Sequence, residues 1–251
     1  MTAPSSEPAL EVVGLKKAFG GLAVTQDVSL KVRAGERRLI IGPNGAGKTT
    51  LFNQISGDLR PNAGSIRLLG ADVTYLPPYK RAHRGLSRTY QIITLFAGDT
   101  LEHNVSLGLL GLRPSRWQMW LPMTSYRDLS TDAHRALDAV GLLHLANQPI
   151  SDIAYGERRR VELAVALAQK PRVLLLDEPL AGLSNTERST VKSLIASIPR
   201  DTTVIMIEHD MDTALDLAET VTLLNYGRVI VDGERDAVIA DERTREVYLG
   251  T

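Results

Sequence analysis

The sequence predicts an α/β fold in which a parallel sheet carries the functional residues at the carboxyl ends of its strands. Three short apolar runs, at residues 38–41, 172–176 and 203–207, are typical of fully buried parallel strands. A glycine-rich loop follows the first run, and acidic residues directly follow the other two. At 251 residues the chain allows one large domain or two small ones, with enough length for a substantial core.

The glycine-rich loop leads into a helix that continues with Thr50 and stops at Gly57. The loop consists of Gly42, Pro43, Asn44, Gly45, Ala46, Gly47, Lys48 and Thr49. Its glycines let backbone N–H groups come close to an anion, and the helix start adds partial positive charge. Lys48 can reach the β- and γ-phosphates of a nucleotide, and the Thr49 hydroxyl can ligate Mg²⁺. A turn that only joined strand to helix would not need Lys-Thr at this spacing, so we predict a phosphate-binding loop.

Composition narrows the class of protein further. The 29 basic and 29 acidic side chains cancel, which argues against nucleic acid as the main partner. The absence of cysteine excludes disulfides, thiolate zinc sites and cysteine nucleophiles. The first eight residues do not have the pattern of a signal peptide, and no window holds 18 uninterrupted apolar residues. We therefore expect a soluble, cytoplasmic chain.

Two strands, at residues 9–13 and 28–32, are expected before the loop. Between them, Phe19 is placed to return over a nucleotide base, and stacking on adenine contributes about 1–3 kcal/mol. An ordinary aromatic residue at a strand end is an equally good interpretation. After the loop, residues 64–70 predict a further strand, and the basic cluster at 81–84 is expected to be a solvated face.

The middle of the chain changes to a helical pattern. Gln91 stands at the start of an apolar segment, where its amide could reach a metal ion and an attacking water, although a lone glutamine is usually a surface residue. Residues 101–112 and 131–145 then predict helices, which we interpret as a helical subdomain inserted in the α/β core. Residues 117–123 hold both tryptophans; local packing is favoured there over contact with a partner or membrane surface.

Acidic residues and a histidine mark the ends of the later strands. Asp177 is predicted to hold Mg²⁺ through its water shell, and Glu178 to orient a hydrolytic water while pointing elsewhere, because neighbours on a strand alternate. A buried structural acidic pair is the alternative. His209, which follows the run 203–207, can donate to a γ-phosphate. Arg158, Arg159 and Arg160, at the start of the helix 158–169, are expected on its solvated side.

The remaining segments complete the predicted core. A turn at 181–185 caps a helix at 186–197, and residues 221–224 and 228–231 predict a hairpin. The tail 235–251 is expected to form a short helix with a polar end.

The order of these parts resembles the ATP-binding-cassette (ABC) ATPases over essentially the whole chain. The resemblance rests on the loop 42–49, Gln91, the signature region 153–157, the segment 173–178, the turn 181–185 and His209. It implies the P-loop NTPase fold of ABC ATPases, with a RecA-like core, an antiparallel edge sheet and an inserted helical subdomain. The implied single domain spans 9–251: 9–92 and 160–232 as the core with the edge sheet, 93–159 as the helical subdomain, and 233–251 as the tail.

Several stretches are similar to the branched-chain amino-acid importer branch of that family. They are residues 88–91, 154–159, 181–183, 207–211 and 247–250, and within the branch they look like LivG-type subunits; urea-importer ATPases are close relatives. The resemblance implies an ATPase that uses ATP and Mg²⁺, with Phe19, the loop 42–49 and Thr50 at the ATP. It also implies Thr49, Gln91 and Asp177 at the metal, and Glu178, His209 and Gln91 in catalysis.

The same resemblance implies the partners of the chain. Two ABC ATPase subunits, identical or sibling, would form a head-to-tail dimer in which Ala154, Tyr155, Gly156 and Glu157 contact the ATP of the partner subunit. The dimer would dock on transmembrane permease subunits near Gln91, Leu95 and Phe96, on the cytoplasmic side of the inner membrane. A solute-binding protein outside would take part indirectly, and no nucleic acid is expected.

One position departs from the usual signature of the family. Ala154 stands where a serine normally binds the γ-phosphate, which leaves backbone N–H groups and the helix start for that role. A neutral hydrogen bond contributes about 1 kcal/mol. We therefore expect the two subunits still to close on ATP, but less tightly.

The sequence lacks the features that would indicate other classes of nucleotide-binding protein. No Asn-Lys-x-Asp base-reading motif of a GTP switch occurs, the chain holds one cassette where soluble translation ATPases hold two, and the segment 91–154 is too short for the coiled coil of a chromosome-maintenance ATPase. An ABC subunit that works on a soluble scaffold remains an alternative, which copurification with membrane protein would separate from a transporter.

Overall fold

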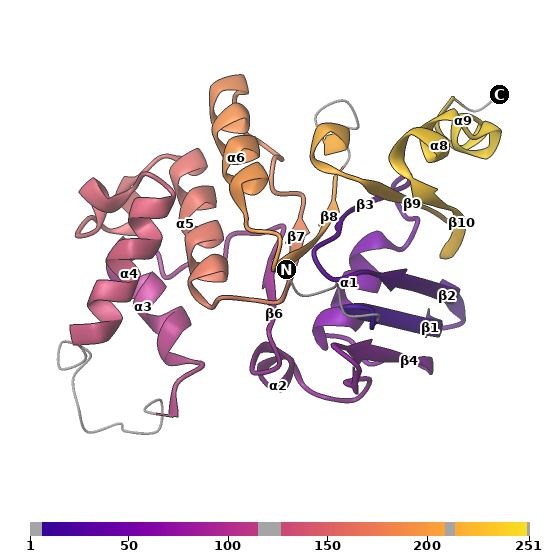
Figure 1. Cartoon of the computed structure of the whole chain (residues 1–251), viewed down its shortest axis with the longest axis horizontal. Coiled ribbons are helices and arrows are strands. Elements are labelled where there is room, and N and C mark those ends of the chain that lie inside the picture. Colours follow the sequence, from indigo (N-terminus) through magenta and orange to yellow (C-terminus); the bar gives the residue numbers. More distant parts are fainter. Residues whose placement is uncertain (1–6, 115–126, 209–213, 250–251) are drawn as a thin grey trace.

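A computed structural model describes residues 7–114, 127–208 and 214–249 of the chain (Figure 1). The strands are β1 (Leu10–Phe19), β2 (Leu22–Val32), β3 (Arg37–Ile41), β4 (Ala63–Leu68), β5 (Ala71–Asp72), β6 (Leu86–Thr89), β7 (Val173–Asp177), β8 (Thr203–Ile207), β9 (Thr220–Asn225) and β10 (Arg228–Glu234). The α-helices are α1 (Lys48–Ser56), α2 (Pro78–Ala82), α3 (Leu101–Leu110), α4 (Arg127–Ala139), α5 (Tyr155–Ala168), α6 (Asn185–Ser197), α8 (Arg235–Ala240) and α9 (Glu242–Leu249).

Two sheets form the scaffold. The larger has the order β10-β9-β3-β8-β7-β6, and the run from β9 to β6 is parallel. Every residue of β3, β7 and β8 is buried, as expected for strands covered on both faces. The smaller sheet has the order β2-β1-β4-β5 and is antiparallel. The predicted α/β class and the antiparallel edge sheet are therefore confirmed.

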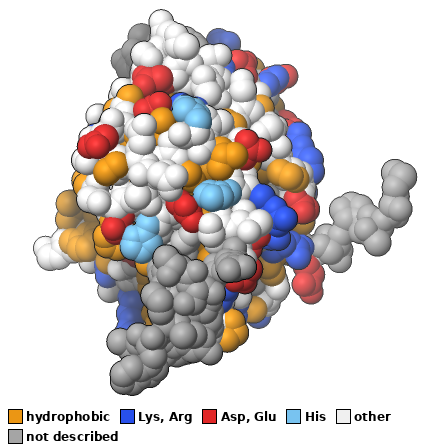
Figure 2. All heavy atoms as spheres, turned by 90° about the vertical axis from the view of Figure 1, so that its left-hand side faces the viewer, with side chains coloured by type: hydrophobic (Ala, Val, Ile, Leu, Met, Phe, Trp, Pro, Cys, Tyr) orange, Lys and Arg blue, Asp and Glu red, His pale blue; other side chains and the backbone are white. Residues whose placement is uncertain are grey.

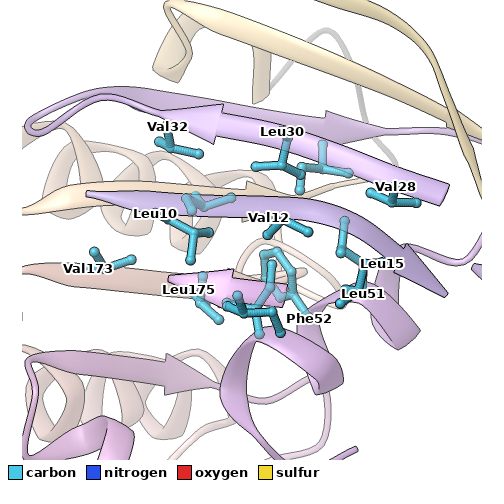
Figure 3. Packing of buried hydrophobic residues seen from close by; sticks show 14 of the residues in the cluster. Leu10, Val12, Leu15, Val28, Leu30, Val32, Leu51, Phe52, Val173 and Leu175 are labelled. Carbon is cyan, nitrogen blue, oxygen red and sulfur yellow. The ribbon is translucent and has the colours of Figure 1, made fainter. Parts of the chain in front are cut away.

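Helix α1 lies between the two sheets. Its Leu51 and Phe52 pack with Leu10 and Val12 of the smaller sheet and with Leu175 of β7 in one hydrophobic cluster (Figure 3). This packing holds the start of α1, and the loop before it, at the carboxyl edge of the parallel sheet.

A separate hydrophobic cluster joins α3, α4 and α5 at the end of the molecule opposite the smaller sheet (Figure 1). Helix α5 also contributes Leu163 and Ala166 to the core beside β7, so it links this helical part to the parallel sheet. The residue boundaries given above for the domain parts stay a prediction. On this side of the molecule the described acidic, basic and hydrophobic side chains are interspersed (Figure 2).

Three expected elements differ from those observed. The hairpin of β1 and β2 is longer than the two predicted strands and turns at Gly20 and Gly21. The second helix of the helical part ends at Ala139 instead of residue 145, and Gly141 there takes a left-handed backbone (φ 72°) that an α-helix cannot continue. The tail forms two short helices, α8 and α9, separated at Asp241. The tryptophan segment 117–123 lies outside the described residues.

Arg81 corrects the interpretation of the cluster 81–84 as a solvated face. Its side chain is buried, and its guanidinium donates to the carbonyl oxygens of Gln54 (2.7 Å), Ile55 (2.6 Å), Leu76 (2.9 Å) and Thr74 (2.9 Å). Burial lowers the pKa of Arg81 to about 10. Arg81 therefore satisfies the last carbonyls of α1, which helices otherwise leave without partners.

Among residues 7–114, 127–208 and 214–249, no helix is both long enough and apolar enough to span a lipid bilayer.

Candidate nucleotide-binding site

The loop between β3 and α1 has the backbone that a close approach to an anion requires. Gly42 and Gly47 have positive φ values of 151° and 97°. A Cβ on Gly47 would lie 2.6 Å from the carbonyl oxygen of Val24, and one on Gly42 would overlap the carbonyl oxygen of Leu224. Glycine is therefore needed at both positions, and the start of α1 presents its free N–H groups to this loop.

The loop borders a cavity of about 270 Å³. Residues from three separate segments besides the loop join it there: Val24 from β2, Gln91 after β6, and Glu178 after β7. The full lining is Val24, Asn44, Gly45, Ala46, Gly47, Lys48, Thr49, Thr50, Gln91 and Glu178.

Lys48 supplies the positive charge of the cavity. Its Nζ donates to the carbonyl oxygens of Gly42 (2.7 Å) and Pro43 (3.0 Å), and the side chain is buried. Burial lowers the pKa of Lys48, while the nearby carboxylates of Glu178 and Asp177 act in the opposite direction. An anion placed in the loop would add a partner for this desolvated ammonium group.

The two neighbouring carboxylates behave differently. Asp177, the last residue of β7, is fully buried, and its Oδ2 accepts from Arg88 Nη2 at 2.7 Å. Burial raises the pKa of Asp177, and the Arg88 guanidinium counteracts that rise. Glu178 lines the cavity, and its Oε2 accepts from the side-chain amide of Gln91 at 2.9 Å.

The reason predicted for the divergence of these two carboxylates was wrong. Strand β7 ends at Asp177, and Glu178 takes a left-handed backbone (φ 49°), so a turn and not strand alternation aims Glu178 at the loop. Such a backbone costs about 1–3 kcal/mol for a residue other than glycine, and strained residues of this kind cluster at functional sites.

The donors around the cavity suit Mg²⁺. Within the described part of the chain, no group of three His, Cys, Asp or Glu side chains could enclose a metal. Mg²⁺ does not need one, because it binds through one or two protein oxygens, water and phosphates. Asp177 Oδ1 is buried and has no hydrogen-bond partner, which makes it a ready oxygen donor, and the Thr49 side chain is exposed in the loop.

The signature region begins α5 and does not line this cavity. Ala154 is the residue that caps the helix, but its side chain makes no hydrogen bond; instead Glu157 Oε2 accepts from the Ala154 N–H at 2.8 Å. Gly156 is buried against Glu187 of α6, and a Cβ on Gly156 would overlap the Glu187 carboxylate. Tyr155 is partly exposed and packs on Gly182.

Arg159 corrects the expectation of a solvated arginine face on this helix. Its guanidinium is buried and donates to the backbone oxygens of Tyr90 (2.8 Å) and Glu178 (2.8 Å), and to Glu162 Oε2 (2.8 Å). The signature helix is thus bonded to the segment that carries Gln91 and to the backbone of Glu178.

Phe19 does not line the cavity. Phe19 ends β1 with half of its surface exposed, and Lys17 Nζ lies 5.3 Å from its ring centre. His209 lies outside the described residues.

Arg88 and Arg159 were not identified as site residues from the sequence, although the position of each in its strand or helix indicates burial. Arg88 is a charged residue within β6, which pairs with β7, the strand that ends in Asp177. A buried cation at this place indicates an ion pair. Arg159 shares a helix face with the buried Leu163 and Ala166, which places it on the inner side of α5.

Comparisons with known proteins agree with this geometry. The ABC transporter family profile matches residues 25–181. The chain is 36% identical to the high-affinity branched-chain amino acid transport ATP-binding protein BraF of Pseudomonas aeruginosa, over 98% of this chain and 99% of that protein. It is 35% identical to LivG of Escherichia coli K12, with the same coverage of both chains.

The solved structures agree as well. The crystal structure of the ADP conformation of an ATP-binding cassette of an ABC transporter superposes with a TM-score of 0.86 at 27% identity, over 98% of this chain and 100% of that one. Both the sequence match and the shared fold extend over nearly the full length, so the chain belongs to the ABC transporter family of ATP-binding proteins.

Proposed function

We propose that the chain binds ATP in the loop 42–49 and hydrolyses it to drive an importer of branched-chain amino acids. The observation that carries the proposal is the cavity in which Lys48 and the loop glycines meet the bonded pair Gln91–Glu178. The solute is inferred from BraF and LivG, whose names state branched-chain amino acid transport.

The proposal assigns a role to each of the predicted site groups. The loop N–H groups and Lys48 would hold the triphosphate, and Thr49, Gln91 and Asp177 would hold Mg²⁺, which would neutralise developing charge on the phosphates. Glu178 accepts the proton of the attacking water, and His209 donates to the γ-phosphate. Gln91 bonds Glu178 directly, so a shift of the segment around Gln91 would change the position of the base.

The signature residues support a two-subunit site. Residues 154–157 do not line the cavity of their own chain, and both Ala154 and Tyr155 are exposed. We infer that these residues meet the ATP of a second ABC ATPase subunit in a head-to-tail dimer. The dimer would work on permease subunits at the cytoplasmic side of the inner membrane, where Ile92 and Phe96 present exposed apolar surface beside Gln91.

Two alternative functions can be distinguished from this one by observation. An importer for urea or another small solute would share the ATPase chemistry, and the genes beside this one would distinguish them. A soluble ABC ATPase would not copurify with membrane protein.

Replacement of Lys48 tests the nucleotide site. Lys48→Ala should weaken ATP binding at least about tenfold, because a hydrogen bond to a charged group contributes about 1.5–3 kcal/mol. Equilibrium titration with a fluorescent ATP analogue measures the effect, and Lys80→Ala, at an exposed lysine of α2, is the control. Equal affinity in the wild type and Lys48→Ala would place the nucleotide elsewhere.

Replacement of Phe19 tests where the base lies. Phe19→Ala should weaken ATP binding by about 1–3 kcal/mol if the ring stacks on adenine, and Phe19→Tyr should be nearly silent. The half-exposed ring has area free for a base. Unchanged affinity together with a lower melting temperature in Phe19→Ala would favour a packing role.

A further inference from the structure

Arg88 links α1, the helix that follows the loop 42–49, to β7, the strand that ends in Asp177. It lies on β6, and its side chain is 5% exposed. Nη1 donates to Asn53 Oδ1 (2.7 Å) and Ser56 Oγ (2.9 Å) near the end of α1, and lies 3.2 Å from Asp58 Oδ2. Nη2 donates to Asp177 Oδ2 at 2.7 Å.

The two oxygens of Asp177 are thereby made unequal. Oδ2 is bonded to Arg88, whereas Oδ1 is buried without a hydrogen-bond partner. A buried carboxylate is costly unless it is paired, and the side chain of Asp177 is 1% exposed. Arg88 is the cation that pairs with it, and the bonds from Nη1 to α1 fix the direction from which the guanidinium approaches.

The Arg88 guanidinium is itself held from several sides. Its carbon lies 4.6 Å from the ring centre of Tyr90 and 5.7 Å from that of Phe52. Aromatic faces attract a guanidinium and restrict its orientation. A rigid partner of this kind sets the rotamer of the carboxylate it binds.

We propose that Arg88 is a positioning residue, which holds Oδ2 of Asp177 so that Oδ1 is presented to the Mg²⁺ of the bound nucleotide. The inference rests on the proposed ATP-binding function and adds to it a residue that never touches the nucleotide. Outer-shell partners of metal-binding groups act in this way, and their loss costs about 10–100-fold in metal affinity or activity.

A purely structural role predicts a different result. If Arg88 only tied α1 to β7, its loss would lower stability and would weaken nucleotide binding equally with and without Mg²⁺. If it positions Asp177, its loss weakens specifically the contribution of Mg²⁺ to nucleotide affinity, since each ligand changes the affinity of the other by the same factor.

The experiment compares nucleotide affinity in Mg²⁺ with that in EDTA, for full-length protein that carries Glu178→Gln to slow hydrolysis. A fluorescent ATP analogue is titrated against otherwise unchanged protein, Arg88→Met, Arg88→Lys and Arg37→Met, and the melting temperature of each is recorded. Arg37 is the matched control: its buried guanidinium donates to the carbonyl oxygens of Ile195 and Ile198, at the end of α6 and away from Asp177.

The quantity to compare is the nucleotide affinity in Mg²⁺ divided by that in EDTA. Arg88→Met should reduce this ratio by about 10–100-fold and leave the affinity in EDTA little changed. Arg37→Met should lower the melting temperature and keep the ratio. Arg88→Lys retains a charge opposite Asp177, but one ammonium cannot reproduce the planar fork of arginine, so its ratio should fall between those of Arg88→Met and the unchanged protein.

An unchanged ratio in Arg88→Met, or an equal fall in Arg37→Met, would overturn the positioning role. If Arg88→Met does not fold, an unchanged ratio in folded Arg88→Lys overturns it instead. Failure of the proposed function looks different, because protein with Arg88 intact would then bind no nucleotide or show no effect of Mg²⁺.

Discussion

Glu178→Gln is expected to lower the rate of ATP hydrolysis by about 10²–10⁴-fold while ATP binding is retained. The amide cannot accept the proton of the attacking water, but it keeps the shape of the side chain that lines the phosphate-loop cavity. The turn that aims residue 178 at the loop is a property of the backbone (φ 49°) and should persist in the variant.

Steady-state phosphate release measures the rate, and titration in Mg²⁺ measures the affinity. Glu11→Gln, which changes a carboxylate on β1, is the control for loss of one acidic group. Turnover near that of the wild type in Glu178→Gln would remove Glu178 from the role of general base.

Gly156→Asp is expected to block ATP-driven dimerisation and to leave ATP binding by the single subunit intact. The new Cβ would overlap the Glu187 carboxylate, and the new charge would face both that carboxylate and the triphosphate of the partner subunit. The loop 42–49 of the same chain is unchanged, so binding there should survive.

Gly156→Ala separates the two causes, because it adds the Cβ without the charge and should weaken dimerisation less. Both variants are measured by light scattering in a Glu178→Gln background, with ATP affinity determined separately. Intact dimerisation in Gly156→Asp would show that the signature assignment at 153–157 is wrong.

The sequence predicted those parts of the site whose residues are required by the backbone conformation or burial of their own segment. Glycines at 42 and 47 are required by a backbone with positive φ and by close neighbouring carbonyls, so they are visible in the sequence as a spaced motif. Likewise, β7 and β8 are buried on both faces, and continuous apolar runs that end in acidic residues mark them.

The parts that it missed depend on partners far along the chain. Arg81, Arg88 and Arg159 all read as exposed charges or went unnoticed, yet each is held by backbone carbonyls or carboxylates from other elements. The positions of Arg88 on the strand paired with β7 and of Arg159 on an inner helix face indicate burial, but a charge count cannot find the partners, because these come from elements far along the chain. The left-handed turn at Glu178 was missed for a different reason: no glycine or asparagine marks it.

ATP-driven dimerisation of the Glu178→Gln protein tests the central claim, that two ABC ATPase subunits, here two copies of this chain, close on ATP between one loop and the opposite signature region. Light scattering of the purified protein should report a monomer without nucleotide and a dimer with ATP and Mg²⁺, and Lys48→Ala added to the same protein should keep it monomeric. A monomer that is fully occupied by ATP would contradict closure between two identical copies of this chain.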